Sequence, residues 1–177
     1  IAAGVFRRNE TMHVIDYPGT ESRIQARTAW EPDHLRGNYG DVLLLDEYQL
    51  FSEHCWGEVI APMTLDRNAA CVFAFTPPSL RSSVLSKAHD PLHAVKFYKA
   101  AEADTTGRWS VHHFSSHANP HLSTTALQEI TEDMTNLAYR QEILAELIDE
   151  IPGALWTRTI LDRTRVKDMA VPELSRI

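Results

Sequence analysis

Two adjacent carboxylates, Asp46 and Glu47, directly follow an apolar run of four residues, Val42 to Leu45. A continuous apolar run without alternation is typical of a strand that is buried on both faces of a parallel sheet. Ligands bind just beyond the carboxyl ends of such strands. At this place, Asp46 would hold Mg²⁺ through its water shell, and Glu47 would orient or deprotonate a water that attacks a nucleotide. The alternative is that the pair merely ends a strand and caps the next helix.

A hydroxyl side chain, Thr76, ends a second unbroken apolar run at residues 69–75. Neighbouring parallel strands lie about 5 Å apart, so we expect Thr76 and Asp46 within several ångströms of each other. A small hydroxyl there can sense the γ-phosphate or the catalytic water and relay its loss to the next segment. A turn threonine before proline is the competing interpretation. The acids one crossover earlier favour the catalytic role.

The loop that would cradle a triphosphate is missing from the chain. Such a loop has the pattern GxxxxGK[ST], in which backbone amides surround the phosphates and the lysine reaches the β and γ positions. None of the lysines follows a glycine pair of this kind. The phosphate-binding half of the site is therefore expected before Ile1, unless it never existed. Arg36, in the turn Leu35–Gly37, is a candidate for a phosphate or subunit contact, although an exposed arginine without such a role is equally consistent.

The two apolar runs are joined by a segment with a helical pattern. Residues 52–63 predict a helix with Ser52 as its N-cap and with Trp56, Val59, Ile60 and Met63 on one face. Strand, helix and strand with short links form a right-handed parallel crossover. The expected class is therefore α/β, with a mostly parallel sheet flanked by helices.

The rest of the chain supplies weaker signals. They predict the following elements: a helix tail at 1–10, a hairpin or neighbouring edge strands at 12–17 and 23–26, a helix within 89–102, a strand at 109–114, a helix capped by Thr125 and Gln128 that turns Leu127, Ile130 and Met134 inward, a helix at about 137–147, and an amphipathic piece at 156–166.

Composition narrows the class of protein. A chain of 177 residues with 44% apolar content suits one globular domain, and its net charge of −7 argues against a protein that coats nucleic acid over its whole surface. Cys55 and Cys71 indicate buried thiols in a reducing compartment. Neither a membrane span nor a signal peptide is visible. Because the chain opens on Ile1 rather than Met, we interpret it as an internal piece of a longer protein.

Four histidines lie close together in the sequence, at positions 112, 113, 117 and 121. A cluster of histidines in the sequence could indicate a zinc site. However, Pro120 and the serines at 115 and 116 break any helix that would align the four rings, and no cysteine or acid joins them. Exposed histidines in a strand and loop are the preferred interpretation.

Taken as an ordered set, several motifs resemble the large terminase subunit of tailed phages and prophages, the ATP-driven motor that packages DNA into the capsid. The motifs are LRG at 35–37, VLLLDEY at 42–48, FAFTPP at 73–78, W…FSSxANP at 109–120, YRQEILAEL at 139–147 and GALWTRTILDRTRV at 153–166. Each motif is weak alone, whereas their order and spacing match over approximately residues 12–177.

The resemblance implies roles for the residues already singled out. Asp46 looks like the Walker B ligand of Mg²⁺, Glu47 like the catalytic carboxylate, and Thr76 like the coupling residue that links ATP hydrolysis to movement. Residues 1–166 would be part of a P-loop-type ATPase domain of the additional-strand, RecA-like class without its Walker A portion. Residues 167–177 would begin the linker to a nuclease domain that the chain lacks.

The resemblance also implies partners and a location. They are double-stranded DNA, the portal protein, the small terminase subunit and further copies in a ring, with no membrane, in the cytoplasm of an infected bacterium and transiently docked on the procapsid. Neither ATP turnover nor DNA cleavage is expected of these residues alone. Two alternatives remain: a superfamily-2 helicase-like ATPase, and a non-catalytic nucleic-acid-binding or scaffold domain that kept the fold and lost the phosphate loop.

Overall fold

The computed structural model describes residues 6–78, 86–148, 155–156 and 158–165. The strands are β1 (Arg7–Asn9), β2 (Val14–Asp16), β3 (Arg23–Gln25), β4 (Val42–Leu45) and β5 (Ala70–Phe73). The helices are η1 (Pro32–Leu35), η2 (Tyr48–Leu50), η3 (Trp56–Ile60), α1 (Ala61–Met63), α2 (His93–Glu102), η4 (Ser116–Ala118), α3 (Thr124–Glu132), α4 (Asn136–Ala138), η5 (Tyr139–Ile143) and α5 (Arg158–Thr164). Of these, η1, η2 and η4 are 3₁₀-helices, and η3 and η5 are π-helices.

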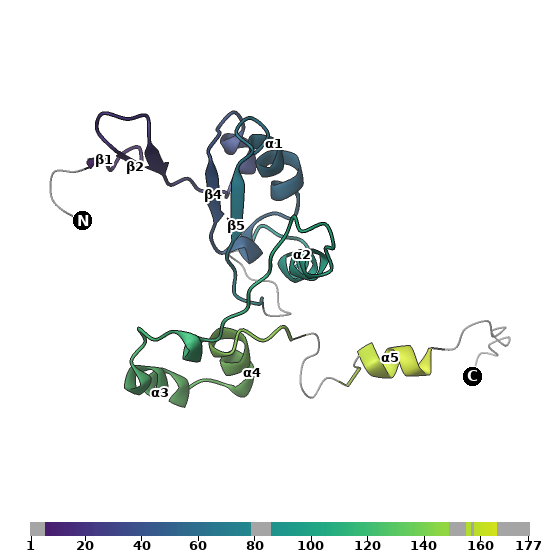
Figure 1. Cartoon of the computed structure of the whole chain (residues 1–177). Helices are drawn as coiled ribbons and strands as arrows, with labels where there is room; N and C mark the ends of the chain where they lie inside the picture. The colour runs from purple at the N-terminus through teal and green to yellow at the C-terminus, as the bar shows by residue number, and fades with distance from the viewer. Residues whose placement is uncertain (1–5, 79–85, 149–154, 157, 166–177) are drawn as a thin grey trace.

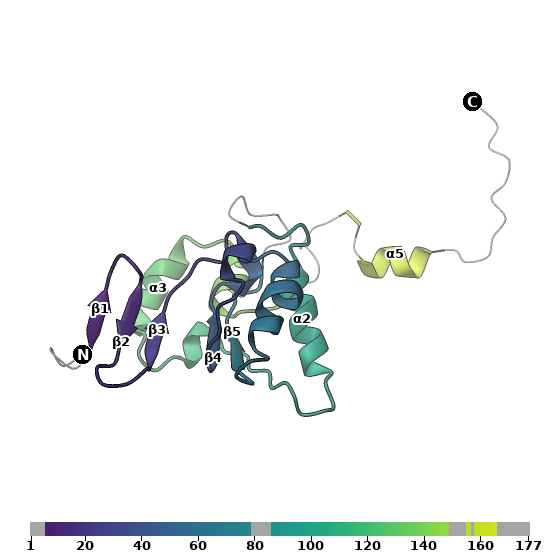
Figure 2. The same ribbon diagram turned by 90° about the horizontal axis from the view of Figure 1, so that it is seen from above.

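The strands form two separate sheets. Strands β4 and β5 pair in parallel, with Val42 opposite Ala70 and Leu45 opposite Phe73. The chain between them contains η2, η3 and α1, so the predicted strand–helix–strand unit is confirmed. Strands β1, β2 and β3 form an antiparallel meander, which confirms the hairpin. Strand β1 lies in the second half of the 1–10 segment that was expected to be a helix tail, and the first five residues of that segment lie outside the described residues. Figures 1 and 2 show the meander on one side of β4–β5 and α2 on the other.

The parallel sheet is covered on one face. Leu45 is 4% exposed and Leu43 packs against the core, whereas the intervening Leu44 is 69% exposed. Val42 on the same strand and Val72 on β5 are exposed too. The prediction that these strands are buried on both faces is therefore wrong, because only the face toward η3 and α2 has covering elements in the described part of the chain.

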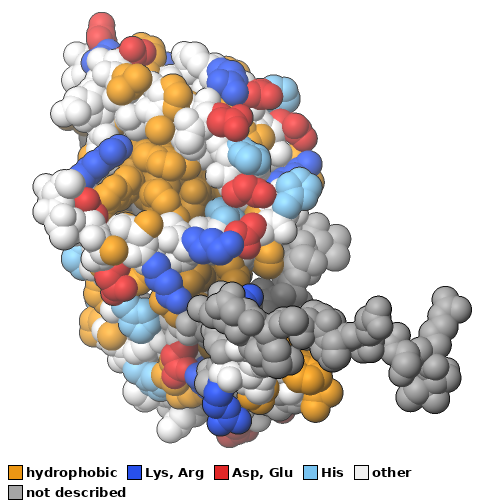
Figure 3. Space-filling view, turned by 90° about the vertical axis from the view of Figure 1, so that its right-hand side faces the viewer, with side chains coloured by type: hydrophobic (Ala, Val, Ile, Leu, Met, Phe, Trp, Pro, Cys, Tyr) orange, Lys and Arg blue, Asp and Glu red, His pale blue; other side chains and the backbone are white. Residues whose placement is uncertain are grey.

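The core lies between the sheet and its helices. It contains Leu35, Leu45, Tyr48, Cys55, Val59, Ile60 and Ala94, with Trp56, Met63, Phe73 and Phe97 packed against it. All four residues predicted for the inner face of the 52–63 helix therefore do lie at the core. Several of the aromatic rings are half-buried, and Figure 3 shows hydrophobic side chains gathered in a hollow on one side of the molecule with charged side chains around it.

The C-terminal half of the chain departs further from the expected pattern. Residues 109–114 form no strand, since no neighbouring strand edge pairs with them among the described residues. Helix α3 is capped by Ser123, whose side chain accepts a hydrogen bond from Ala126 N, and not by Thr125. Ile130 is exposed rather than inward.

The helix predicted at 137–147 is split into α4 and the π-turn η5, which ends at Ile143. The piece predicted at 156–166 contains α5. Residues 167–177, predicted to start a linker, lie outside the described residues. Figure 1 shows α3 and α4 gathered below the β4–β5 unit, and we call residues 116–148 the helical part. Among the described residues, no helix combines the length and apolarity needed to cross a bilayer.

Candidate functional site at the carboxyl ends of strands β4 and β5

The chain segments that follow β4 and β5 are held together by backbone hydrogen bonds. Ala74 N donates to Leu45 O at 2.9 Å, and Tyr48 N donates to Ala74 O at 3.0 Å. The backbone around Asp46 and Glu47 is thus fixed beside Ala74, two residues before Thr76. The pairing of the strands therefore brings the segment that carries the two acids and the segment that leads to Thr76 to the same edge of the sheet.

Glu47 has an unusual backbone conformation. Its φ of 53° and ψ of 42° lie in the left-handed region, which non-glycine residues rarely occupy. Such outliers persist only where the surrounding structure holds them, and they cluster at functional sites. Here the turn is held by the bond from Glu47 N to Asp46 Oδ1 at 3.1 Å and by the Tyr48–Ala74 bond. Both carboxylates are exposed at this turn, where a ligand can reach them.

Gln49 is a contact of Glu47 that the sequence pattern did not reveal. Its side-chain amide donates from Nε2 to Glu47 Oε2 at 2.7 Å, while its backbone carbonyl lies 3.3 Å from His93 Nε2. The other amide atom, Oε1, is buried without a hydrogen-bond partner in the described structure. A buried acceptor of this kind calls for an explanation, such as a donor supplied by a bound group. The only signal in the sequence is an amide two residues after the acid.

Tyr48 anchors the turn in the core. Its side chain is buried, and its ring contacts the rings of Phe51, Phe73, His93 and Phe97 with centroid separations of 4.9–5.7 Å. Burial, followed by the nearby Cys55 thiol, raises the pKa of Tyr48 to about 12. The phenol therefore stays neutral, and the aromatic contacts fix the residue next to Glu47.

Thr76 lies at the start of a restricted segment. It is half-buried, Pro77 after it is buried, and Pro78 continues the segment. Proline fixes φ near −65° and restricts the residue before it. Thr76 is therefore held in an extended or turn conformation, and its role beside the acids remains a prediction.

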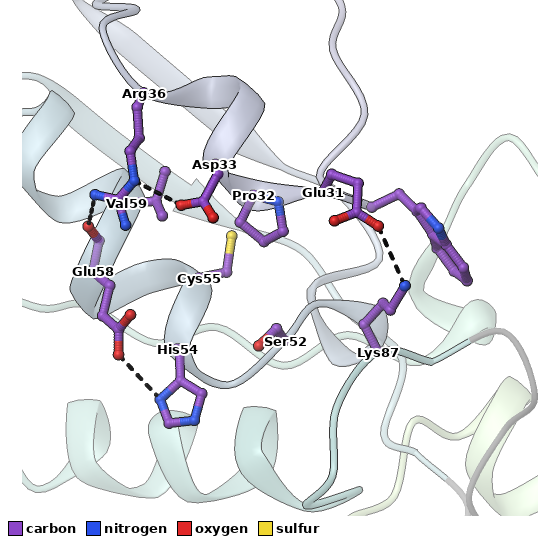
Figure 4. Close-up of a pocket in the computed structure, with 11 residues that line it drawn as sticks. Glu31, Pro32, Asp33, Arg36, Ser52, His54, Cys55, Glu58, Val59 and Lys87 are labelled. Atoms are coloured by element: carbon purple, nitrogen blue, oxygen red, sulfur yellow. Dashed lines mark hydrogen bonds and ion pairs between the residues drawn. The ribbon is translucent and has the colours of Figure 1, made fainter.

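Arg36 lies in a different place, in the pocket drawn in Figure 4. Its Nε donates to Asp33 Oδ1 at 2.7 Å and its Nη1 donates to Glu58 O at 2.9 Å. The pocket has a volume of about 280 Å³ and is lined by Trp30, Glu31, Pro32, Asp33, Arg36, Ser52, His54, Cys55, Glu58, Val59 and Lys87. Asp46, Glu47 and Thr76 are not among these residues. The structure thus brings the two acids and Thr76 to one edge of the sheet and places Arg36 elsewhere.

Each of the two cations that line this pocket, Arg36 and Lys87, lies beside an acid. Lys87 Nζ lies 3.5 Å from Glu31 Oε1 and 4.1 Å from the centroid of the Trp30 ring, and Figure 4 shows Lys87 at the opposite end of the pocket from Arg36. Exposed ion pairs of this kind contribute only about 0–1 kcal/mol to stability. Either cation could therefore exchange its present partner for a phosphate at small cost.

In the described part of the chain, the site offers few protein ligands for a metal ion. Across the described ranges, no group of three or more His, Cys, Asp or Glu is placed to hold a metal ion. Asp46 alone fits Mg²⁺, which commonly keeps several waters and takes one or two carboxylates together with substrate phosphates.

The histidines at 112, 113, 117 and 121 are exposed loop residues, and the strand expected for the first two is absent. His113 Nε2 lies 2.9 Å from Ala145 O, and His117 Nε2 lies 2.9 Å from Tyr139 Oη. His112 stacks on Phe114. The His113 contact connects the loop before η4 to the helical part, whereas the His117 contact lies within the helical part.

No protein-family model and no curated protein sequence matches the chain. Two solved structures do: the large terminase ATPase domain of Thermus phage P74-26, and a mutant of that domain in which one arginine is replaced by alanine. The TM-scores are 0.51 and 0.52, at 18% and 17% sequence identity respectively, and each match covers 81% of this chain. The chain spans 63% of the length of either matched structure. It thus shares the fold of a phage large terminase ATPase domain, with an α/β architecture built on a small parallel sheet.

Proposed function

We propose that the chain is part of the ATPase domain of a phage large terminase, a motor that hydrolyses ATP to move double-stranded DNA into a procapsid. The observation that carries this proposal is the parallel pairing of β4 and β5, which are followed at their carboxyl ends by Asp46 and Glu47 after β4 and by Thr76 three residues after β5. The shared fold supports the same assignment. The finer class, a P-loop-type, RecA-like domain with an additional strand, belongs to the proposal.

The three residues would divide the work. Asp46 holds Mg²⁺ through coordinated water, and Glu47 orients or deprotonates the water that attacks the γ-phosphate. Mg²⁺, when bound with ATP, supplies charge neutralisation for the transferred phosphoryl group. Gln49 holds the Glu47 carboxylate through the 2.7 Å hydrogen bond, which limits the directions that the carboxylate can take. Thr76 senses the loss of the γ-phosphate and passes it to the following segment.

The phosphate-binding loop would come from polypeptide that this chain does not include. Two observations support this part of the proposal. The chain spans only 63% of the matched domain, and one face of the parallel sheet is open, with Val42, Leu44 and Val72 exposed. In α/β domains of this kind, helices cover both faces of the sheet. The remaining part of the domain would therefore cover this open face and bring the phosphate loop to the ends of β4 and β5.

Arg36 would act on the nucleotide of a neighbouring copy. It does not line the same surface as Asp46 and Glu47, yet its weak exposed ion pair with Asp33 leaves it available for a phosphate. A homo-oligomeric ring would place it at the next subunit's ATP. In such a ring, an arginine supplied by a neighbour stabilises the charge that develops on the phosphoryl group.

The remaining features of the proposal follow from the motor assignment. The partners are double-stranded DNA, the portal protein and the small terminase subunit, and the site of action is the cytoplasm of the infected host at the procapsid. Residues 1–166 belong to the ATPase domain, and residues 167–177 begin the link to a nuclease domain that would cleave the DNA.

Turnover of ATP by the complete protein tests the proposal. We expect Mg²⁺-dependent hydrolysis, and we expect Glu47→Gln to lower it by about 10²–10⁴-fold while ATP binding stays within a few-fold, because removal of a general base typically costs that much in rate. Glu53→Gln is the matched control, since Glu53 is a nearby acid outside the strand ends. Unchanged turnover in Glu47→Gln would remove Glu47 from the site. No turnover in the unmodified protein would favour the non-catalytic scaffold.

A further inference from the structure

The segment after Thr76 is connected to the helical part through one buried side chain. Gln141, on η5, is 7% exposed, and its Nε2 donates a hydrogen bond to Pro78 O at 3.2 Å. The two residues lie 63 positions apart in the chain. We call this hydrogen bond the Gln141–Pro78 contact. It begins two residues after the hydroxyl that the proposed function places at the γ-phosphate.

The contact joins two stiff pieces of chain. Pro77 is buried and Pro78 follows it directly, so both residues have a fixed φ and Thr76 before them is restricted. The fixed φ angles leave fewer backbone rotations that could absorb a displacement of Thr76 before it reaches the carbonyl of Pro78. On the other side, a buried amide that lost its acceptor would be left with an unsatisfied donor, so we expect the Gln141 side chain to follow the carbonyl.

Gln141 is in turn fixed within the helical part. It lies in a π-turn, a feature that is rare in proteins and frequent at functional sites. Arg140 Nε and Glu146 Oε2 form an ion pair at 2.5 Å across the end of this turn, where Ala145 has a φ of 53°. His113 contacts the Ala145 carbonyl from the preceding loop. These contacts hold the C-terminal end of the π-turn, so we expect a displacement of Gln141 to move the adjoining segment of the helical part with it.

We propose that Gln141 is the positioning residue that transmits the state of the Thr76 segment to the helical part of the chain. This inference rests on the proposed function, because it takes Thr76 as the residue that senses the nucleotide. Gln141 touches neither the nucleotide nor the two acids. Its effect is on the coupling between hydrolysis and movement, and not on the chemical step.

The side-chain chemistry suggests a sharp test in the complete protein. Gln141→Glu keeps the shape but replaces the amide donor by a carboxylate that would repel the Pro78 carbonyl, and Gln141→Met keeps the approximate volume without any donor. Glu142→Gln is the control, because Glu142 lies on the same turn and is exposed. The readouts are ATP turnover, movement along linear double-stranded DNA, and energy transfer between dyes at the exposed positions Leu65 and Glu129, with and without ATP.

For both Gln141 variants we expect ATP turnover within about twofold of the unmodified protein and DNA movement per ATP reduced about tenfold, since both variants remove the hydrogen bond that couples the Thr76 segment to the helical part. The ATP-dependent change in energy transfer should disappear in both variants and persist in Glu142→Gln. Retained movement and retained energy-transfer change would overturn the inference while leaving the proposed function standing. Equal losses of turnover and movement, or loss of folding in both variants, would assign Gln141 to the site or to stability alone and also overturn it. Absence of ATP turnover in the unmodified protein would overturn the proposed function together with this inference.

Discussion

Leucines 44 and 45 offer a matched pair of perturbations, because they are adjacent on β4 and face opposite sides of the sheet. Leu45 is 4% exposed, so Leu45→Ala removes a fully buried side chain and leaves a cavity, which typically costs about 2–5 kcal/mol. Leu44 is 69% exposed, so about a third of its side chain is buried in this chain. Since burying a whole leucine is worth about 1.5–3 kcal/mol, Leu44→Ala should cost less than about 1 kcal/mol here.

The same pair gives a different result if the open sheet face is covered in the complete protein. Leu44 would then be buried as well, and Leu44→Ala should cost about 2–5 kcal/mol there. For a domain of this size, about 3 kcal/mol corresponds to a fall in Tm of roughly 6–12 °C. Urea and thermal unfolding of both variants, measured in this chain and in the complete protein, provide the four values.

Two results would refute this reasoning. Equal costs for Leu44→Ala and Leu45→Ala in this chain would mean that the strand does not face one side only. A cost for Leu44→Ala that stays below about 1 kcal/mol in the complete protein would mean that nothing packs on the open face, and the proposal that the rest of the ATPase domain covers it would fail.

Three further predictions concern the residues around the site. Gln49→Leu in the complete protein should lower kcat for ATP hydrolysis about tenfold with KM nearly unchanged, because it removes the amide that holds Glu47; steady-state kinetics equal to those of the unmodified protein would contradict this. Arg36→Ala should abolish most ATP turnover in the assembled ring, and mixing it with Glu47→Gln subunits should restore part of the rate; a mixture no more active than its components would place Arg36 outside the neighbour's site. Burial raises the pKa of the Cys55 thiol from its usual 9.0 to about 11, so between these values the unfolded chain loses a proton that the folded chain keeps, and stability should fall as the pH rises from 9 to 11. Urea midpoints at pH 8 and pH 10.5 check this, and an equal fall in Cys55→Ala would assign the effect to other groups.

The part of the fold that the sequence predicts best is the parallel strand pair. Two unbroken apolar runs joined by a helical stretch leave few topologies, and the structure pairs Val42–Leu45 with Ala70–Phe73 as expected. The pattern could not tell a strand covered on one face from a strand covered on both. That difference depends on which other polypeptide packs on the sheet, and a continuous apolar run is consistent with either state.

The errors in the C-terminal half have a similar origin. Residues 109–114 alternate as a strand would, but strand formation also needs a free neighbouring edge, and Trp109 instead packs its ring against Trp56, Phe73 and Phe97. The cap of helix α3 lies two residues before the expected one, because Ser123 also supplies a capping oxygen. Local sequence patterns are compatible with such elements, and tertiary contacts determine which of them form.

The residues of the site also fall into those that the sequence predicts and those that only tertiary contacts reveal. Asp46, Glu47 and Thr76 could be selected because their types follow strand ends, where chemistry is expected. Gln49 and Gln141 could not, because an amide in a polar or helical stretch has no pattern that separates a buried hydrogen bond from a surface position. Their partners, Glu47 and the Pro78 carbonyl, became evident only from the coordinates.

The most direct test of the account is an experimental structure of the complete protein with Mg²⁺ and a non-hydrolysable ATP analogue. We expect Asp46 to accept hydrogen bonds from water molecules bound to the metal, and Glu47 to lie beside the water that faces the γ-phosphate. We expect the Thr76 hydroxyl within about 6 Å of the same phosphate, a little more than one strand spacing. An analogue bound away from the ends of β4 and β5, or a Thr76 hydroxyl turned to the opposite side of the domain from the two acids, would contradict it.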